Sequence, residues 1–83
     1  MSIMEGLIQN AIEALEELKE DTNLPKNVKI KIVKIIIDLQ ARGNSNLEIN
    51  KVLSQLEEIS EDMNLQAYTR TQLFNIVSIL EGV

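Results

Sequence analysis

The chain has 83 residues, a formal net charge of −5, and neither cysteine nor histidine. Without these side chains, disulfides, thiolate zinc sites and histidine-based catalysis are excluded. The longest apolar run covers only residues 35–37, whereas a membrane-spanning helix needs ~20 apolar residues. The start, MSIMEGLIQN, lacks the basic and apolar regions of a signal peptide. We therefore expect a single cytoplasmic domain over residues 1–83 that does not enter a membrane.

The first expected element is an amphipathic helix. Ser2 and Glu5 have the spacing of a capping box at its start. The apolar residues that follow recur at the spacing of one helix face, at Met4, Leu7, Ile8, Ala11, Ile12, Leu15 and Leu18. The segment 21–25 predicts a turn after this helix.

The second element is ambiguous, because residues 28–32 (VKIKI) alternate apolar and charged side chains as a strand does. Two features favour a helix. A lone strand would have no partner, and helical spacing continues at Ile32, Ile35, Ile36 and Leu39. Pro25 suits the first turn of this helix, and Gly43 suits its C-terminal cap.

The third and fourth elements are also predicted to be helices. Ser45 and Glu48 form a second capping-box pattern. An apolar face follows at Ile49, Val52, Leu53, Leu56 and Ile59, and the last segment has one at Leu73, Ile76, Val77 and Leu80. The remaining connections are expected near residues 43–45 and 62–66.

An acidic phrase occurs twice in the chain. Residues 15–24 (LEELKEDTNL) and 56–65 (LEEISEDMNL) are identical at seven of ten positions, 41 residues apart. The correspondence continues downstream, as in the match of Leu39 with Leu80. We therefore predict two copies of one helical hairpin, at about residues 2–42 and 45–82. The predicted fold is an all-α, antiparallel up-down-up-down four-helix bundle built from two repeated helical hairpins.

The stretches EDTNLPKNVK and EDMNLQAYTRTQLFNIVSILE resemble a small family of uncharacterised archaeal proteins, which are acidic and all-helical. Asp21 and Pro25 match the Asp-x-x-x-Pro turn of this family. Its C-terminal signature is matched at Thr69, Arg70, Thr71, Asn75, Ile76, Val77, Ser78 and Leu80. Gln66 stands where the family usually has a second proline. The resemblance implies a compact helical fold and an archaeal cytoplasmic setting, and it implies no activity because the family's function is unassigned.

Acidic residues gather around both copies of the repeated phrase, and the predicted topology brings the two turns to one end of the bundle. The candidates for a cation site there are Glu16, Glu20, Asp21, Glu57, Glu61 and Asp62. The structural alternative is that these residues stabilise the helices themselves. Asp21 and Asn23, like Asp62 and Asn64, would cap the helix that follows them, and Glu16 and Glu17 would pair with lysines of the second helix. The sequence has no phosphate-binding loop, nucleophile–base motif or cofactor motif, so we expect neither enzymatic activity nor a cofactor.

The second helix has two further features. Its four lysines, Lys26, Lys29, Lys31 and Lys34, project to different flanks without interleaved aromatic residues, which disfavours nucleic-acid binding. Ile30, Val33 and Ile37 form a second apolar stripe, nearly opposite the core face. One interpretation is two-fold self-association through this stripe, and the other is a helix buried more deeply in its own bundle.

Three functions follow from these features. The first is a structural or interaction module, a homodimer that also binds a protein partner. The second is a weak nucleic-acid-binding or ribosome-associated accessory protein that uses the second helix. The third is a bundle whose acidic end binds divalent cations. The sequence favours the first function, because the chain lacks residues that the other two functions require.

Overall fold

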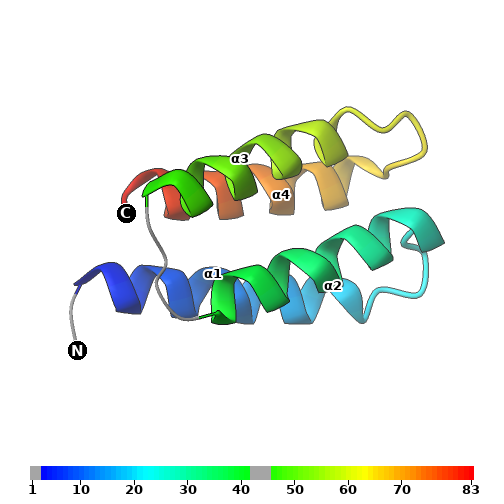
Figure 1. Cartoon of the computed structure of the whole chain (residues 1–83). Helices are drawn as coiled ribbons and strands as arrows, with labels where there is room; N and C mark the ends of the chain where they lie inside the picture. Colours follow the sequence, from blue (N-terminus) through cyan, green and yellow to red (C-terminus); the bar gives the residue numbers. More distant parts are fainter. Residues whose placement is uncertain (1–2, 42–45) are drawn as a thin grey trace.

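The computed structural model describes residues 3–41 and 46–83, and all regular structure in these ranges is helical (Figure 1). The four helices are α1 (Ile3–Lys19), α2 (Lys26–Gln40), α3 (Asn46–Ser60) and α4 (Ala67–Glu81). The predicted all-α fold is therefore confirmed. The caps predicted at Ser2, Gly43 and Ser45 lie outside the described residues. α2 ends at Gln40, and Ala41 already has an extended backbone with φ −66° and ψ 149°.

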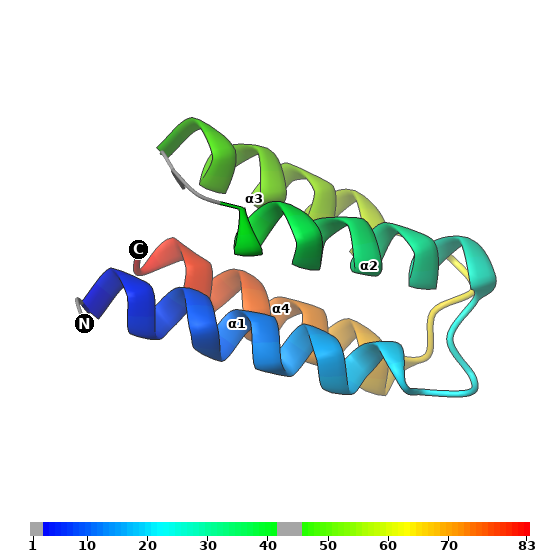
Figure 2. The ribbon, with the colours of Figure 1, turned by 60° about the horizontal axis from the view of Figure 1, so that its bottom comes forward.

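The helices form a closed four-membered bundle. α1 contacts α2 and α4, and α3 contacts the same two helices, so each helix has two neighbours. Consecutive helices are antiparallel, and the α1–α2 and α3–α4 turns lie at the same end of the bundle (Figure 1, Figure 2). This is the predicted up-down-up-down arrangement, and it brings both copies of the acidic phrase to one end.

α2 is helical across residues 28–32, whose alternating side chains are also compatible with a strand. Val28 and Ile32 are 1% and 0% exposed, whereas Ile30 between them is 65% exposed. In a helix, residues four apart share a face and the residue midway between them points away. The alternation therefore fits the helix, and this conformation buries Ile35, Ile36 and Leu39 in the same core as well.

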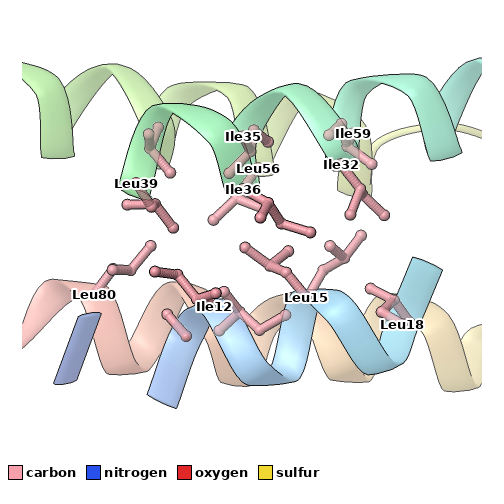
Figure 3. Close-up of a cluster of buried hydrophobic side chains, with 14 of the residues drawn as sticks. Ile12, Leu15, Leu18, Ile32, Ile35, Ile36, Leu39, Leu56, Ile59 and Leu80 are labelled. Atoms are coloured by element: carbon pink, nitrogen blue, oxygen red, sulfur yellow. The ribbon is translucent and has the colours of Figure 1, made fainter. Parts of the chain in front are cut away.

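The core consists almost entirely of aliphatic side chains. Leu15 and Leu56, which begin the two copies of the acidic phrase, are both 0% exposed. Full burial of one such side chain stabilises a fold by about 1.5–3 kcal/mol. In Figure 3, side chains of α2 and α3 face those of α1 and α4; the labelled residues are Ile12, Leu15, Leu18, Ile32, Ile35, Ile36, Leu39, Leu56, Ile59 and Leu80. The main apolar contact thus runs between two layers, α1 with α4 and α2 with α3, and each layer contains one helix from each hairpin.

The two turns have matching geometry. The N–H of Leu24 donates to the carbonyl oxygen of Asp21, and that of Leu65 to Asp62, both at 3.2 Å. Both leucines are buried and join the core. These correspondences agree with two related hairpins, whereas duplication of the sequence stays a prediction.

Candidate functional site

The outer face of α2 carries exposed apolar side chains. Ile30 and Ile37 are 65% and 60% exposed, and Val33 between them is partly buried. The opposite face of α2 supplies core residues, so the helix is apolar on two sides. The alternative in which the stripe is buried within its own bundle is therefore wrong for Ile30 and Ile37. We call Ile30, Val33 and Ile37 the α2 stripe.

Lysines surround the α2 stripe. Lys26, Lys29, Lys31 and Lys34 are all exposed. They are half of the eight basic residues of a chain that has 13 acidic ones. The single acidic residue of α2, Asp38, is half-buried, and its Oδ2 atom is buried without a hydrogen-bond partner. The solvent-facing charge of α2 is consequently positive along most of its length.

The charged side of this face continues into a small groove between α2 and α3. Its volume is about 170 Å³, and its lining includes Lys31, Lys34, Gln55 and Glu58. The Oε1 atom of Gln55 is buried there without a hydrogen-bond partner. Lys34 thus lies between the apolar stripe on one side and a glutamate of α3 on the other.

α4 is the counterpart of α2 in the second hairpin, and its outer face differs. Positions 71, 74 and 78 correspond to the α2 stripe at the 41-residue offset, and they are occupied by Thr71, Phe74 and Ser78. Phe74 is 55% exposed, and the hydroxyl of Thr71 donates to the carbonyl oxygen of Ala67 at 3.1 Å within the helix. The continuous aliphatic stripe is therefore a property of α2 and not of both hairpins.

The acidic end of the bundle is formed by the two turns and the helix ends beside them. The Oδ1 atom of Asp21 accepts the backbone N–H of Asn23 at 2.9 Å, and that of Asp62 accepts the N–H of Asn64 at 2.8 Å. Neither α2 nor α4 has a side-chain hydrogen bond at its N-cap, where Pro25 and Gln66 stand. The predicted capping role of these aspartates was wrong: an aspartate readily binds the backbone two residues ahead, and this stabilises the turn itself.

The six acidic candidates do not converge on one centre. Glu20 and Asp21 line a cavity of about 310 Å³ between α1 and α4, together with Glu17, Tyr68 and Gln72. Glu16, Glu57 and Glu61 are exposed elsewhere on this end, and Asp62 belongs to the second turn. Within residues 3–41 and 46–83, no group of three or more acidic side chains is placed to hold a metal ion.

Arg70 has a structural role that the sequence did not suggest. Its Nε atom donates to the carbonyl oxygen of Ser60 at 3.0 Å, and its Nη2 atom donates to the carbonyl oxygen of Asp62 at 3.1 Å. These carbonyls belong to the end of α3 and the turn after it, so a cation from α4 binds the negative end of the α3 dipole. Lys29 occupies the corresponding position of the first hairpin and is exposed. The signal available in the sequence was this single change from lysine to arginine.

These features define a small all-α four-helix bundle with an unpartnered, lysine-flanked apolar face and no assembled metal-binding group in its described parts. The chain belongs to the uncharacterised protein family UPF0147, which it matches over residues 1–83. The resemblance to a family of uncharacterised archaeal proteins is thereby confirmed. No helix within the described ranges is long and apolar enough to cross a membrane.

Relatives and solved structures agree with this assignment. A UPF0147 protein of Thermoplasma volcanium is 33% identical, with 100% of this chain and 94% of the relative covered. One of Saccharolobus solfataricus is 34% identical, with 95% and 90% covered. The crystal structure of a UPF0147 protein from Thermoplasma acidophilum has a TM-score of 0.87 at 34% identity, covering 94% of this chain and 93% of that one. A second crystal structure, of a protein of unknown function, has a TM-score of 0.83 at 32% identity, covering 93% and 89%.

Proposed function

We propose that the protein is a non-catalytic interaction module of the cytoplasm, which self-associates through the α2 stripe and also binds a protein partner. One observation carries the proposal: Ile30 and Ile37 are 65% and 60% exposed on the same outer face of a helix whose other face is already buried. A helix of a small bundle needs one apolar face for its own core, so a second one indicates a contact with another molecule.

The spacing of the α2 stripe suits packing against a helix. Ile30, Val33 and Ile37 are separated by three and four residues, which is the spacing of apolar residues along a helix–helix seam. If two copies of α2 pack antiparallel about a two-fold axis near Val33, Ile30 of each copy lies opposite Ile37 of the other. Such a contact is self-complementary, as a two-fold dimer requires.

The area of the stripe limits the strength of this contact. Three partly exposed aliphatic side chains offer on the order of 250 Å² per copy, compared with ~800 Å² per partner in a stable interface. The stems of the flanking lysines add apolar area, but their ammonium groups repel across a two-fold axis. We therefore expect weak self-association, with a Kd on the order of 0.1 mM.

Analytical ultracentrifugation tests the proposal. The wild-type weight-average mass should rise from monomer towards dimer as the concentration increases from about 0.01 to 1 mM, spanning the expected Kd. The double variant Ile30→Gln/Ile37→Gln should stay monomeric with unchanged helicity, because glutamine removes apolar area and keeps helix propensity.

The matched control changes exposed apolar residues off the stripe. Ile3 and Leu47 are 85% and 78% exposed, and Ile3→Gln/Leu47→Gln should associate like the wild type. A wild-type chain that remains monomeric across the whole concentration range contradicts the proposal. Equal loss of association in both double variants would show that exposed apolar residues act non-specifically.

A further inference from the structure

We infer that the α2 stripe and its lysines form a docking surface for an acidic amphipathic helix of a partner protein. This inference rests on the proposed function, because it assigns a partner to the surface already described. A two-fold contact between copies would cover the apolar residues of the α2 stripe. It would also bring the lysines of the two copies close together, where their charges repel.

The charge of α2 sets the chemistry of the partner. All four lysines of α2 are exposed around the α2 stripe, and its one carboxylate, on Asp38, is half-buried. The rest of the chain is strongly acidic, since the four remaining basic residues are set against twelve acidic ones. A second α2 brings lysines, whereas an acidic helix brings carboxylates to every flank. Electrostatic complementarity of this kind selects partners and accelerates their association.

The shape of the surface sets the form of the partner. Ile30 and Ile37 are two helical turns apart, about 10 Å along the axis. Since the surface is the convex side of one helix, the partner that covers it best is another helix, packed at an interaxial distance of about 8–10 Å. The matching sequence has apolar residues at i, i+3 or i+4, and i+7, with glutamates or aspartates on both sides of them.

Two other anionic partners fit the surface less well. A nucleic acid would leave Ile30 and Ile37 uncovered, and α2 has no aromatic residue on which a base could stack. An anionic membrane would accept both features, but the chain carries a net charge of −5 and the stripe is only three residues long. The observations thus favour a protein helix, and the other two partners become outcomes of the test.

The probe is a synthetic helical peptide of about 14 residues, long enough to cover the stripe with a turn to spare at each end. It has leucines along one face and glutamates on both flanks, and it carries a fluorescent label for anisotropy. Two matched peptides replace either the glutamates by lysines or the leucines by glutamines. The competing probes are a uridine dodecamer and vesicles that contain phosphatidylserine.

We expect the acidic amphipathic peptide to bind the full-length chain with a Kd of about 10–100 µM at low salt, and several-fold more weakly at about 0.3 M salt because the charges are screened. Both matched peptides should bind at least about tenfold more weakly. Chemical-shift changes should map to α2 and not to α4, whose outer face is the internal control.

Two variants separate the contributions. Lys26→Gln/Lys29→Gln/Lys31→Gln/Lys34→Gln should lose affinity and most of the salt dependence, whereas Ile30→Gln/Ile37→Gln should lose affinity and keep the salt dependence. Both should retain wild-type helicity, because every changed side chain is exposed. Equal affinity for the acidic and basic peptides overturns the inference. So does tighter binding of the uridine dodecamer or the vesicles than of the peptide.

The outcomes distinguish this inference from the self-association on which it builds. If the chain dimerises through the α2 stripe and binds no acidic peptide, the inference fails and the self-association stands. If the peptide binds α2 and the free chain is monomeric, the docking surface stands and self-association fails. If both hold, the peptide should dissociate the dimer, because the two contacts use the same residues.

Discussion

Replacing Arg70 by methionine should destabilise the bundle through the end of α3. The hydrophobic stem of the side chain is retained, whereas the guanidinium and its two hydrogen bonds to the carbonyl oxygens of Ser60 and Asp62 are lost. At the wild-type helix end, N–H groups of the turn satisfy the carbonyls of Glu58 and Ile59, and the hydroxyl of Ser60 satisfies that of Glu57 at 2.7 Å. Arg70 satisfies the next carbonyl oxygen along the chain, that of Ser60.

The magnitude follows from these contacts. A hydrogen bond to a charged group contributes about 1.5–3 kcal/mol when it is well buried. Arg70 is only partly buried, so water replaces part of each bond, and a favourable interaction with the helix dipole of about 0.3–1 kcal/mol is lost as well. We expect a total loss of about 2 kcal/mol in the free energy of unfolding. For a domain of this size, that corresponds to a decrease in Tm of roughly 8–16 °C.

Urea denaturation followed by circular dichroism at the helix band measures this loss. The matched control is Lys29→Met, which changes the corresponding exposed residue of the first hairpin and should alter stability by less than about 0.5 kcal/mol. Arg70→Lys should fall between the wild type and Arg70→Met, because an ammonium group cannot reproduce the fork of the guanidinium. Equal destabilisation by Lys29→Met and Arg70→Met would refute the reasoning.

Two further predictions concern the core and the second turn. Leu56→Ala should lower the free energy of unfolding by about 2–5 kcal/mol, because Leu56 is 0% exposed and its truncation leaves a cavity. Leu47→Ala changes an exposed residue of the same helix and should lower it by less than about 0.5 kcal/mol. Thermal melts of both variants test this difference. Gln66→Pro should raise the free energy of unfolding by about 0.4–1 kcal/mol, because proline restricts the conformations of the unfolded chain. The folded backbone can accept proline, since Gln66 has φ −69°, close to the −56° of Pro25 in the first turn. A lower Tm for Gln66→Pro would show that the second turn needs a backbone that proline cannot adopt.

The helical elements could be predicted from sequence because apolar periodicity and helix packing require the same residues. The clearest case is α2, where local alternation at residues 28–32 competes with the longer period through Ile36 and Leu39. The longer period prevails because a helix buries all of its apolar positions in one core. The second apolar stripe was also visible in the sequence, and the structure adds that Ile30 and Ile37 face solvent.

Features that depend on a single hydrogen bond could not be predicted in the same way. Asp21 and Asp62 were expected to cap the helices that follow, and they bind Asn23 and Asn64 within their turns instead. The N-cap positions of α2 and α4 are Pro25 and Gln66, four residues beyond these aspartates, and residue spacing alone does not fix where a helix begins. The reach of Arg70 across to α3 depends likewise on the packing of two helices, which no local pattern records.

The closed ring of contacts described above has a consequence for how the chain can be divided. α1 contacts α4 and α2 contacts α3, so each hairpin covers the apolar face of the other. A peptide cut between residues 41 and 46 would leave every one of these helix contacts intact. The two halves expressed as separate chains should therefore be unfolded or aggregated alone and should fold on mixing. The two hairpins are in this respect complementary fragments, and each becomes ordered only when it packs against the other.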